Sequence, residues 1–263
     1  MATVALPAAT PRLRSGPVEW LRSCAVMARW QLASLRLFIP MLAAVEVLAG
    51  VGFVLGFGLF FTSRVPATSV VYCATGVPVI TLYIVGLVFL PQVVGMQKLA
   101  HTYEFLQSEP VPRSAGFVSW YAMNLLVGVP GMVASLIAGW LRFGVSLHVS
   151  AAVIPATLLV CLTSSAIGFA MGHAVAVPMV SNVLAQVLNF VAIGFSPIAM
   201  PAGQLPDWLA SLNRGLPFGS MGTIMRSALG VATPDSVPGA YALLAGWTCA
   251  GLLLAAVAVM RRG

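Results

Sequence analysis

The residues most able to do chemistry lie together in one short segment, residues 101–114, which reads HTYEFLQSEPVPRS. It holds a histidine, two carboxylates and an arginine: His101, Glu104, Glu109 and Arg113. The H-x-x-E spacing of His101 and Glu104 is not a metal motif without further ligands. The four cysteines are scattered without a C-x-x-C pair, and there is no phosphate-binding G-x-x-x-x-G-K loop. These residues therefore form no recognisable catalytic constellation, and a plain solvated turn is one interpretation of the segment.

A second set of polar residues lies inside apolar segments. Glu46 is the only formal charge within an expected membrane span. A charge at the centre of a span costs about 2.5 to 3.5 kcal/mol on insertion scales, so Glu46 should face protein or water. It is either a carboxylate of a substrate pathway or of coupling, or a structural hydrogen-bonding group near the cytoplasmic edge.

Three amides follow helical spacing further along the chain. Asn182, Gln186 and Asn189 are four and three residues apart, so they share one helical face. Such side chains either hydrogen-bond to other helices or line a substrate route. Together with Asn124, in the third expected span, they complete our candidates for a substrate pathway.

The composition defines the elements that must position these residues. Only 7% of the 263 residues are charged and 60% are hydrophobic, whereas soluble domains have about 25% charged residues. A span needs roughly 20 apolar residues, and the apolar stretches are 37–63, 67–97, 114–141, 143–206 (two passes) and 236–260. Because these runs do not alternate in polarity, we predict an all-α membrane protein with six transmembrane helices.

The basic residues predict the orientation of the chain rather than nucleic-acid binding. Nine fall on one side of the expected spans: Arg12, Arg14, Arg22, Arg29, Arg36, Lys98, Arg113, Arg261 and Arg262. Four fall on the other: Arg64, Arg142, Arg214 and Arg226. The positive-inside rule places both termini and the 101–114 segment in the cytoplasm. The first apolar run starts too late for a cleaved leader, so we expect a multi-pass plasma (inner) membrane protein.

The N-terminal region, residues 1–36, is expected to be separate from a six-helix membrane domain over 37–263. Its sequence predicts an amphipathic helix that starts at Gly16 and Pro17, with Arg22, Arg29 and Arg36 in line on one face. Such a helix would lie on the cytoplasmic membrane surface. It serves either as an anchor or as a regulatory or ATPase-contacting element.

Two further patterns concern packing. Gly52 and Gly56 in the first span form a G-x-x-x-G pair, which permits close helix approach. The segment between the fifth and sixth spans, residues 202–238, is too apolar for a free loop and too rich in proline and glycine to cross. Short helices lying against or dipping into the outer leaflet fit it best.

Two stretches resemble a known family, the type-2 ATP-binding-cassette (ABC) exporter permeases. The first matches the cytoplasmic loop between the second and third spans through Thr102, Glu104, Phe105, Leu106, Pro110, Val111 and Arg113. The second matches the stretch after the fifth span through Pro197, Leu205, Pro206, Trp208, Leu209, Asn213 and Pro217. The chain departs from the family in lacking its Glu-Arg-Gly before the first stretch, and in having Glu109 where a small residue is usual.

The resemblance implies that the first stretch is a coupling helix that docks on an ABC ATPase subunit. The implied coupling residues are His101, Thr102, Tyr103, Glu104, Phe105, Leu106, Ser108, Glu109, Pro110 and Arg113. It also implies a second permease copy, identical or not, and two ATPase copies. ATP and Mg would bind to the ATPase, with no cofactor in this chain and no nucleic acid as partner.

The function expected from these observations is a permease subunit that moves an amphiphile, such as a drug, lipid or peptide, outward. The alternatives are a polysaccharide or glycolipid exporter of the same family, and an intramembrane enzyme or assembly protein without transport. An enzyme should show several ionisable residues at one membrane depth, whereas the spans contain Glu46 alone.

Overall fold

The computed structural model describes residues 16–60, 66–102, 112–145, 147–233 and 235–260. These residues are almost entirely helical, and none of them forms a strand. Six helical stretches are long and apolar enough to cross a membrane, which confirms the predicted six-helix architecture. They are Phe38–Leu59, Ala67–Leu99, Ser114–Phe143, Val153–Ala174, Pro178–Phe195 and Val237–Ala258.

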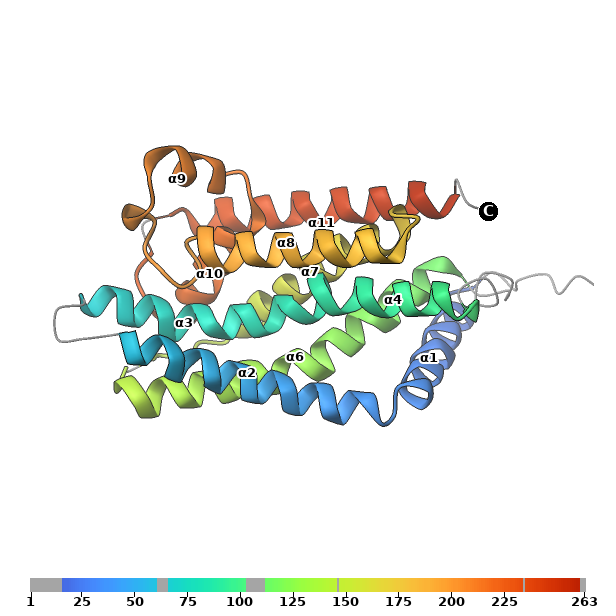
Figure 1. Cartoon of the computed structure of the whole chain (residues 1–263), viewed down its shortest axis with the longest axis horizontal. Helices are drawn as coiled ribbons and strands as arrows, with labels where there is room; N and C mark the ends of the chain where they lie inside the picture. Colours follow the sequence, from blue (N-terminus) through green and yellow to red (C-terminus); the bar gives the residue numbers. More distant parts are fainter. Residues whose placement is uncertain (1–15, 61–65, 103–111, 146, 234, 261–263) are drawn as a thin grey trace, which may run out of the picture.

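The spans run side by side, with shorter helices at the two ends of the bundle (Figure 1). The described helices are α1 (Pro17–Ser34), α2 (Phe38–Phe60), α3 (Ala67–Ile84), η1 (Val85–Phe89), α4 (Leu90–Leu99), α6 (Arg113–Phe143), α7 (Val153–Ala174), α8 (Pro178–Phe195), η2 (Ala202–Gln204), α9 (Asp207–Asn213), α10 (Pro217–Ala228) and α11 (Val237–Met260). Figure 1 shows α1 and the C-terminal end of α11 at one end, called the terminal end below. The short helix α9 lies at the opposite end, called the α9 end.

The second span is the centre of the bundle and the most buried of the six. It consists of α3, the π-helical segment η1 and α4. Ile80 and Tyr83 on α3 have no exposed surface. Pro91, at the start of α4, lacks the N–H that would bond to the carbonyl of Leu87. Val85–Phe89, the segment that contains this unbonded carbonyl, is π-helical, with hydrogen bonds between residues five apart.

The second span crosses the fourth at a pair of glycines. A methyl group added to Gly168 on α7 would overlap the carbonyl oxygen of Gly86 on η1. A methyl group on Gly86 would in turn lie 2.6 Å from the amide nitrogen of Asn124. Small residues are therefore required at both positions for this backbone contact. Within a membrane such contacts are stabilised by close packing and by hydrogen bonds between helices, because lipid is as apolar as the side chains.

The first span packs mainly on the third. A methyl group added to Gly50 would lie 3.0 Å from the carbonyl oxygen of Gly131, so α2 and α6 approach closely there. The predicted pair Gly52 and Gly56 takes no part in this contact, because a methyl group on either would meet nothing within 4 Å. That pair lies among exposed apolar residues, including Leu48, Leu55 and Leu59.

Helix α1 begins at Pro17 as predicted and packs on the start of α6. The indole N–H of Trp20 donates to Ser114 Oγ at 2.9 Å. Cys24 and Gln31 are buried, and burial raises the pKa of the Cys24 thiol because the thiolate would lose hydration. The predicted arginine face is exposed, as are the apolar side chains of Leu21 and Leu32. The helix thus has a face against the protein in addition to its polar and apolar faces.

The segment between the fifth and sixth spans contains short helices, as expected, but they differ in burial. Helix α9 exposes Trp208 and Leu212. Helix α10 instead enters the core, where Met221 and Met225 have no exposed surface. It therefore acts as a core helix and does not lie flat on the outside of the bundle.

Candidate functional site

Most of the residues implied to contact an ATPase lie outside the described residues. These are Tyr103, Glu104, Phe105, Leu106, Ser108, Glu109 and Pro110. His101 and Thr102 are described, and Arg113 begins α6. The flanks of the segment nevertheless show how it is attached to the bundle.

Lys98, in the last turn of α4, connects this flank to α7. Its Nζ donates to the carbonyl oxygen of Gly172 at 2.5 Å and to that of Val175 at 2.8 Å. Because α7 ends at Ala174, these carbonyls have no partner in the next helical turn. A cation is also favoured at the C-terminus of a helix by the helix dipole. The bonds therefore tie the chain just before the 101–114 segment to the end of the fourth span.

His101 ends the second span in an unusual backbone conformation. Its φ is 56°, in the left-handed region that favours glycine. The preceding residue, Ala100, donates its N–H to the carbonyl of Met96 at 3.0 Å and closes the last turn of α4. His101 thus ends the helical direction of α4 at the first residue of the 101–114 segment, as residues that follow a helix C-cap often do.

Glu46 lies in the contact between α2 and α6. It is only 4% exposed, and a methyl group added to Gly131 would lie 3.2 Å from its Cβ. Among the described residues its Oε2 has no hydrogen-bond partner. The side chain thus faces the neighbouring helix α6.

Asn124 joins the third and fourth spans. Its Nδ2 donates to Ser165 Oγ at 2.8 Å, and to Ser164 Oγ and the Cys161 carbonyl, each at 3.2 Å. The residue is 1% exposed and lies beside the Gly86 crossing. In this arrangement it bonds one helix to another within the subunit.

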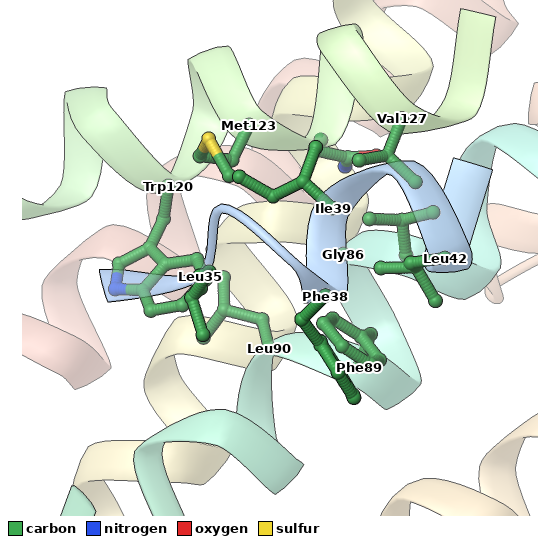
Figure 2. Close-up of a pocket in the computed structure, with 12 residues that line it drawn as sticks. Leu35, Phe38, Ile39, Leu42, Gly86, Phe89, Leu90, Trp120, Met123 and Val127 are labelled. Atoms are coloured by element: carbon green, nitrogen blue, oxygen red, sulfur yellow. The ribbon is translucent and has the colours of Figure 1, made fainter. Parts of the chain in front are cut away.

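Asn124 also lies at the edge of a small apolar pocket, shown in Figure 2. The labelled residues come from the α1–α2 turn, the start of α2, the second span and α6. Phe38 stacks on Phe89 with ring centres 5.4 Å apart. The cavity volume is about 20 Å³, which is close to the minimum of roughly 10 to 15 Å³ that holds one water. The pocket as it stands is too small for an amphiphile.

The three amides of α8 are all half-buried. Asn189 accepts a hydrogen bond from the Tyr83 hydroxyl at 3.3 Å, which supports the helix-bonding interpretation for this residue. Asn182 faces α4, since a methyl group on Gly95 would lie 3.9 Å from its Oδ1. The fully exposed face of α8 is apolar and includes Met179, Val183 and Phe190.

Arg226 is a functional candidate that the sequence interpretation used only to count charges. It lies on α10, is 2% exposed, and donates from Nη1 to the Ile198 carbonyl at 2.7 Å and from Nη2 to the Pro197 carbonyl at 2.9 Å. Burial lowers its pKa to about 10, partly offset by Tyr72 and Asp235. The sequence did contain a sign of this burial, because Arg226 lies among the apolar residues of a short segment. When such a segment packs in the core, its arginine is buried with it.

A cleft of about 600 Å³ opens at the α9 end, between α9, α10 and the start of α11. Its walls carry Arg214 and Asp235 among small and hydroxyl-bearing residues. No sequence pattern predicted this cleft, because its walls come from segments that are separated along the chain.

The described residues contain no group of three or more His, Cys, Asp or Glu that could hold a metal ion. In comparisons with known proteins, a family model described as "ABC-2 family transporter protein" matches residues 55–259. No curated protein matches the sequence.

Proposed function

Because the chain belongs to the ABC-2 family of transporter proteins, whose matched region includes all but the start of the membrane domain, we propose that it is the permease subunit of an ATP-driven exporter. Membership of this family makes it a multi-pass membrane component of an ABC transporter that works with an ABC ATPase. The proposal adds the outward direction, the subunit composition and the class of substrate.

The observation that carries the proposal is the attachment of the coupling segment. Lys98 fixes the end of α4 to the carbonyls at the end of α7, so a force on the segment acts on the second and fourth spans together. The second span is also the most buried one. A soluble subunit that moves this segment would therefore move the centre of the bundle, which ATP-driven transport requires.

We assign the terminal end to the cytoplasm. Arg22, Arg29, Arg36 and Lys98 belong to this end, whereas Arg142, Arg214 and Arg226 belong to the α9 end. Counted over the whole chain the excess is nine to four, and the positive-inside rule then gives cytoplasmic termini. The complex would contain two ATPase copies, with ATP and Mg bound there, and a second permease copy.

An amphiphilic substrate fits the described pathway residues best. Glu46, Asn124 and Asn189 all lie against neighbouring helices of the subunit, so few polar groups remain for a sugar chain. The exposed faces of α2 and α8 are apolar. A route between two permeases would therefore be lined mainly by apolar side chains, which suits a drug, lipid or hydrophobic peptide.

The experiment is reconstitution of the permease with its ABC ATPase. Inside-out vesicles should accumulate a fluorescent amphiphile when ATP is supplied, and the amphiphile should stimulate ATP hydrolysis. Glu104→Ala and Phe105→Ala should weaken this stimulation while the complex still assembles. ATP-dependent loss of amphiphile from such vesicles would contradict the outward direction. Normal coupling in both variants would remove the proposed role of the segment.

A further inference from the structure

The cleft at the α9 end holds two opposite charges on separate walls. Arg214 follows α9, and Asp235 lies just before α11. Both residues are exposed, and within the described part of the chain they form no ion pair with each other. Asp235 also interacts electrostatically with the buried Arg226. Its carboxylate is nevertheless exposed, as is the guanidinium of Arg214, so both groups can meet a ligand in the cleft.

The backbone around Arg214 is fixed on both sides. Asn213 Nδ2 donates to the carbonyl oxygens of Phe195 at 2.6 Å and Leu209 at 2.9 Å. The indole N–H of Trp247, on α11, donates to the carbonyl oxygen of Gly215 at 2.9 Å. Arg214 is therefore mounted on a segment tied to α8, α9 and α11, which limits how far its guanidinium can move from the cleft.

Asp235 is fixed on the other wall. Its Oδ2 accepts a hydrogen bond from the hydroxyl of Thr223 at 3.3 Å, and Thr223 is itself buried on α10. That bond leaves the second carboxylate oxygen for a ligand, since a carboxylate accepts several hydrogen bonds. The carboxylate is thus held by the protein while still presenting negative charge to the cleft.

The rest of the cleft gives it room and additional donors. Gly203, Gly219 and Gly239 leave its walls open, and the hydroxyls of Ser220 and Ser236 line it. Beside it α9 exposes Trp208 (68%) and Leu212 (55%). Tryptophan is enriched where a membrane meets water, so these side chains place the cleft at headgroup depth. This placement holds whichever end of the bundle faces the cytoplasm.

We propose that this cleft binds the headgroup of a zwitterionic phospholipid, with Arg214 on the phosphate and Asp235 on the ammonium group. Charge-assisted hydrogen bonds are the strong ones, and a guanidinium matches phosphate geometry. The two charges then select against an anionic headgroup, because Asp235 would repel it. The proposal goes beyond transport, since it concerns a resident lipid site on the permease alone.

The test measures lipid binding to the purified full-length chain in detergent, without ATPase. Phosphatidylethanolamine and phosphatidylglycerol, each labelled on the acyl chain, are titrated in parallel by fluorescence anisotropy. We expect the Kd of phosphatidylethanolamine to be about tenfold lower than that of phosphatidylglycerol. One charge-assisted hydrogen bond changes a dissociation constant by roughly this factor. Arg214→Gln should weaken both lipids about tenfold, whereas Asp235→Asn should abolish the preference.

Matched controls separate the cleft from general surface charge. Arg142→Gln and Asp207→Asn change exposed charges that do not line the cleft, so both should bind like the unmodified chain. Asp235→Asn keeps an oxygen acceptor for Thr223 but removes a charge that favours the protonated form of the buried Arg226, so its thermal unfolding is measured beside its lipid binding. Equal affinity for the two lipids, or unchanged binding in both cleft variants, would overturn the proposal. So would soluble phosphoethanolamine binding as tightly as the lipid. None of these outcomes depends on transport.

Discussion

The guanidinium carbon of Arg226 lies 4.1 Å from the centre of the Tyr72 ring, so a buried cation on α10 stacks on an aromatic ring of the second span. The same guanidinium bonds to two carbonyls in the turn after α8. Three segments that are far apart in sequence therefore meet at one side chain. The arrangement explains why Gly222 is required one turn earlier, since a methyl group there would lie 2.6 Å from Nη2.

We predict that Arg226→Leu lowers the free energy of unfolding by about 3 kcal/mol, because two carbonyls would lose charge-assisted bonds. Arg226→Lys should cost about half as much, since it keeps the charge without the fork. Thermal unfolding in detergent measures both. The exposed Arg142→Leu serves as control and should stay within about 0.5 kcal/mol of the unmodified chain. Equal losses at positions 226 and 142 would contradict the structural role.

The pH dependence of this effect follows from the direction of the pKa shift. Burial lowers the folded-state pKa of Arg226 to about 10, so the unfolded chain binds more protons only above that pH. The contribution of Arg226 to stability is therefore constant below pH 10 and becomes more favourable above it. The difference between the unmodified chain and Arg226→Leu should be flat from about pH 6 to 9.

The second prediction concerns Lys98. Replacing it by Met removes the two bonds to the end of α7 while keeping an unbranched side chain. We expect the ATPase to associate normally, and transport per ATP hydrolysed to fall severalfold, because movement of α4 would no longer carry α7 with it. Arg36→Met removes an exposed cation at the same end and is the matched control. A Lys98→Met transporter with unchanged coupling would show that the link is only structural.

A third prediction concerns pairing of two permeases. Gly52 and Gly56 lie on an exposed apolar strip of α2, and a methyl group added to either would have no atom of the described residues within 4 Å. If a second copy covers the strip, Gly52→Leu with Gly56→Leu should raise the dimer dissociation constant about tenfold, or about 1.4 kcal/mol. Gly246→Leu, at an equally open glycine of α11, should leave it unchanged. Native mass spectrometry measures both, and equal effects would exclude α2 as the interface.

The fourth prediction concerns orientation. Single cysteines are placed at Ser108→Cys and Thr233→Cys after the four natural cysteines are replaced. The nine-to-four asymmetry of basic residues predicts that a membrane-impermeant reagent labels position 233 in intact cells. Position 108 should react only after the membrane is permeabilised. Labelling of position 108 in intact cells would reverse the proposed topology.

The number of spans and most of their limits followed from the sequence, because uncharged length alone decides which segments can cross a bilayer. The roles of Lys98 and Arg226 did not follow, since the hydrogen bonds of both side chains go to main-chain carbonyls 28 to 77 residues away. Main-chain carbonyls carry no sequence signal. Helical spacing likewise showed that the amides of α8 share a face, but not that Tyr83 lies opposite Asn189.

Glycines illustrate the same limit. Gly52 and Gly56 matched the expected packing motif, yet the backbone contact between α2 and α6 forms at Gly50 and Gly131. A spacing pattern indicates that a close approach is sterically possible at some face. Which face is used depends on the neighbouring helix. The cleft at the α9 end could not be predicted for the same reason, because its walls come from separate segments.

The last prediction decides between the two interpretations of the α8 amides. Asn189→Leu removes the acceptor of the Tyr83 hydroxyl and keeps a similar bulk, so packing should largely survive. If the amide only ties α8 to α3, unfolding should become easier by about 0.6 kcal/mol, the average for hydrogen bonds between membrane helices. Transport per folded molecule should then be unchanged. Tyr83→Phe removes the same bond from the other side, and the double variant should lose no more than either single one.

Gln186 provides the comparison, because it is half-buried on the same helix. Gln186→Leu should alter substrate-stimulated ATP hydrolysis if this residue lines the route, while expression and ATPase association hold. We expect Asn189→Leu to change stability and Gln186→Leu to change transport. Transport loss in Asn189→Leu without loss of stability would place Asn189 on the substrate route. Unchanged transport in Gln186→Leu would remove Gln186 from it.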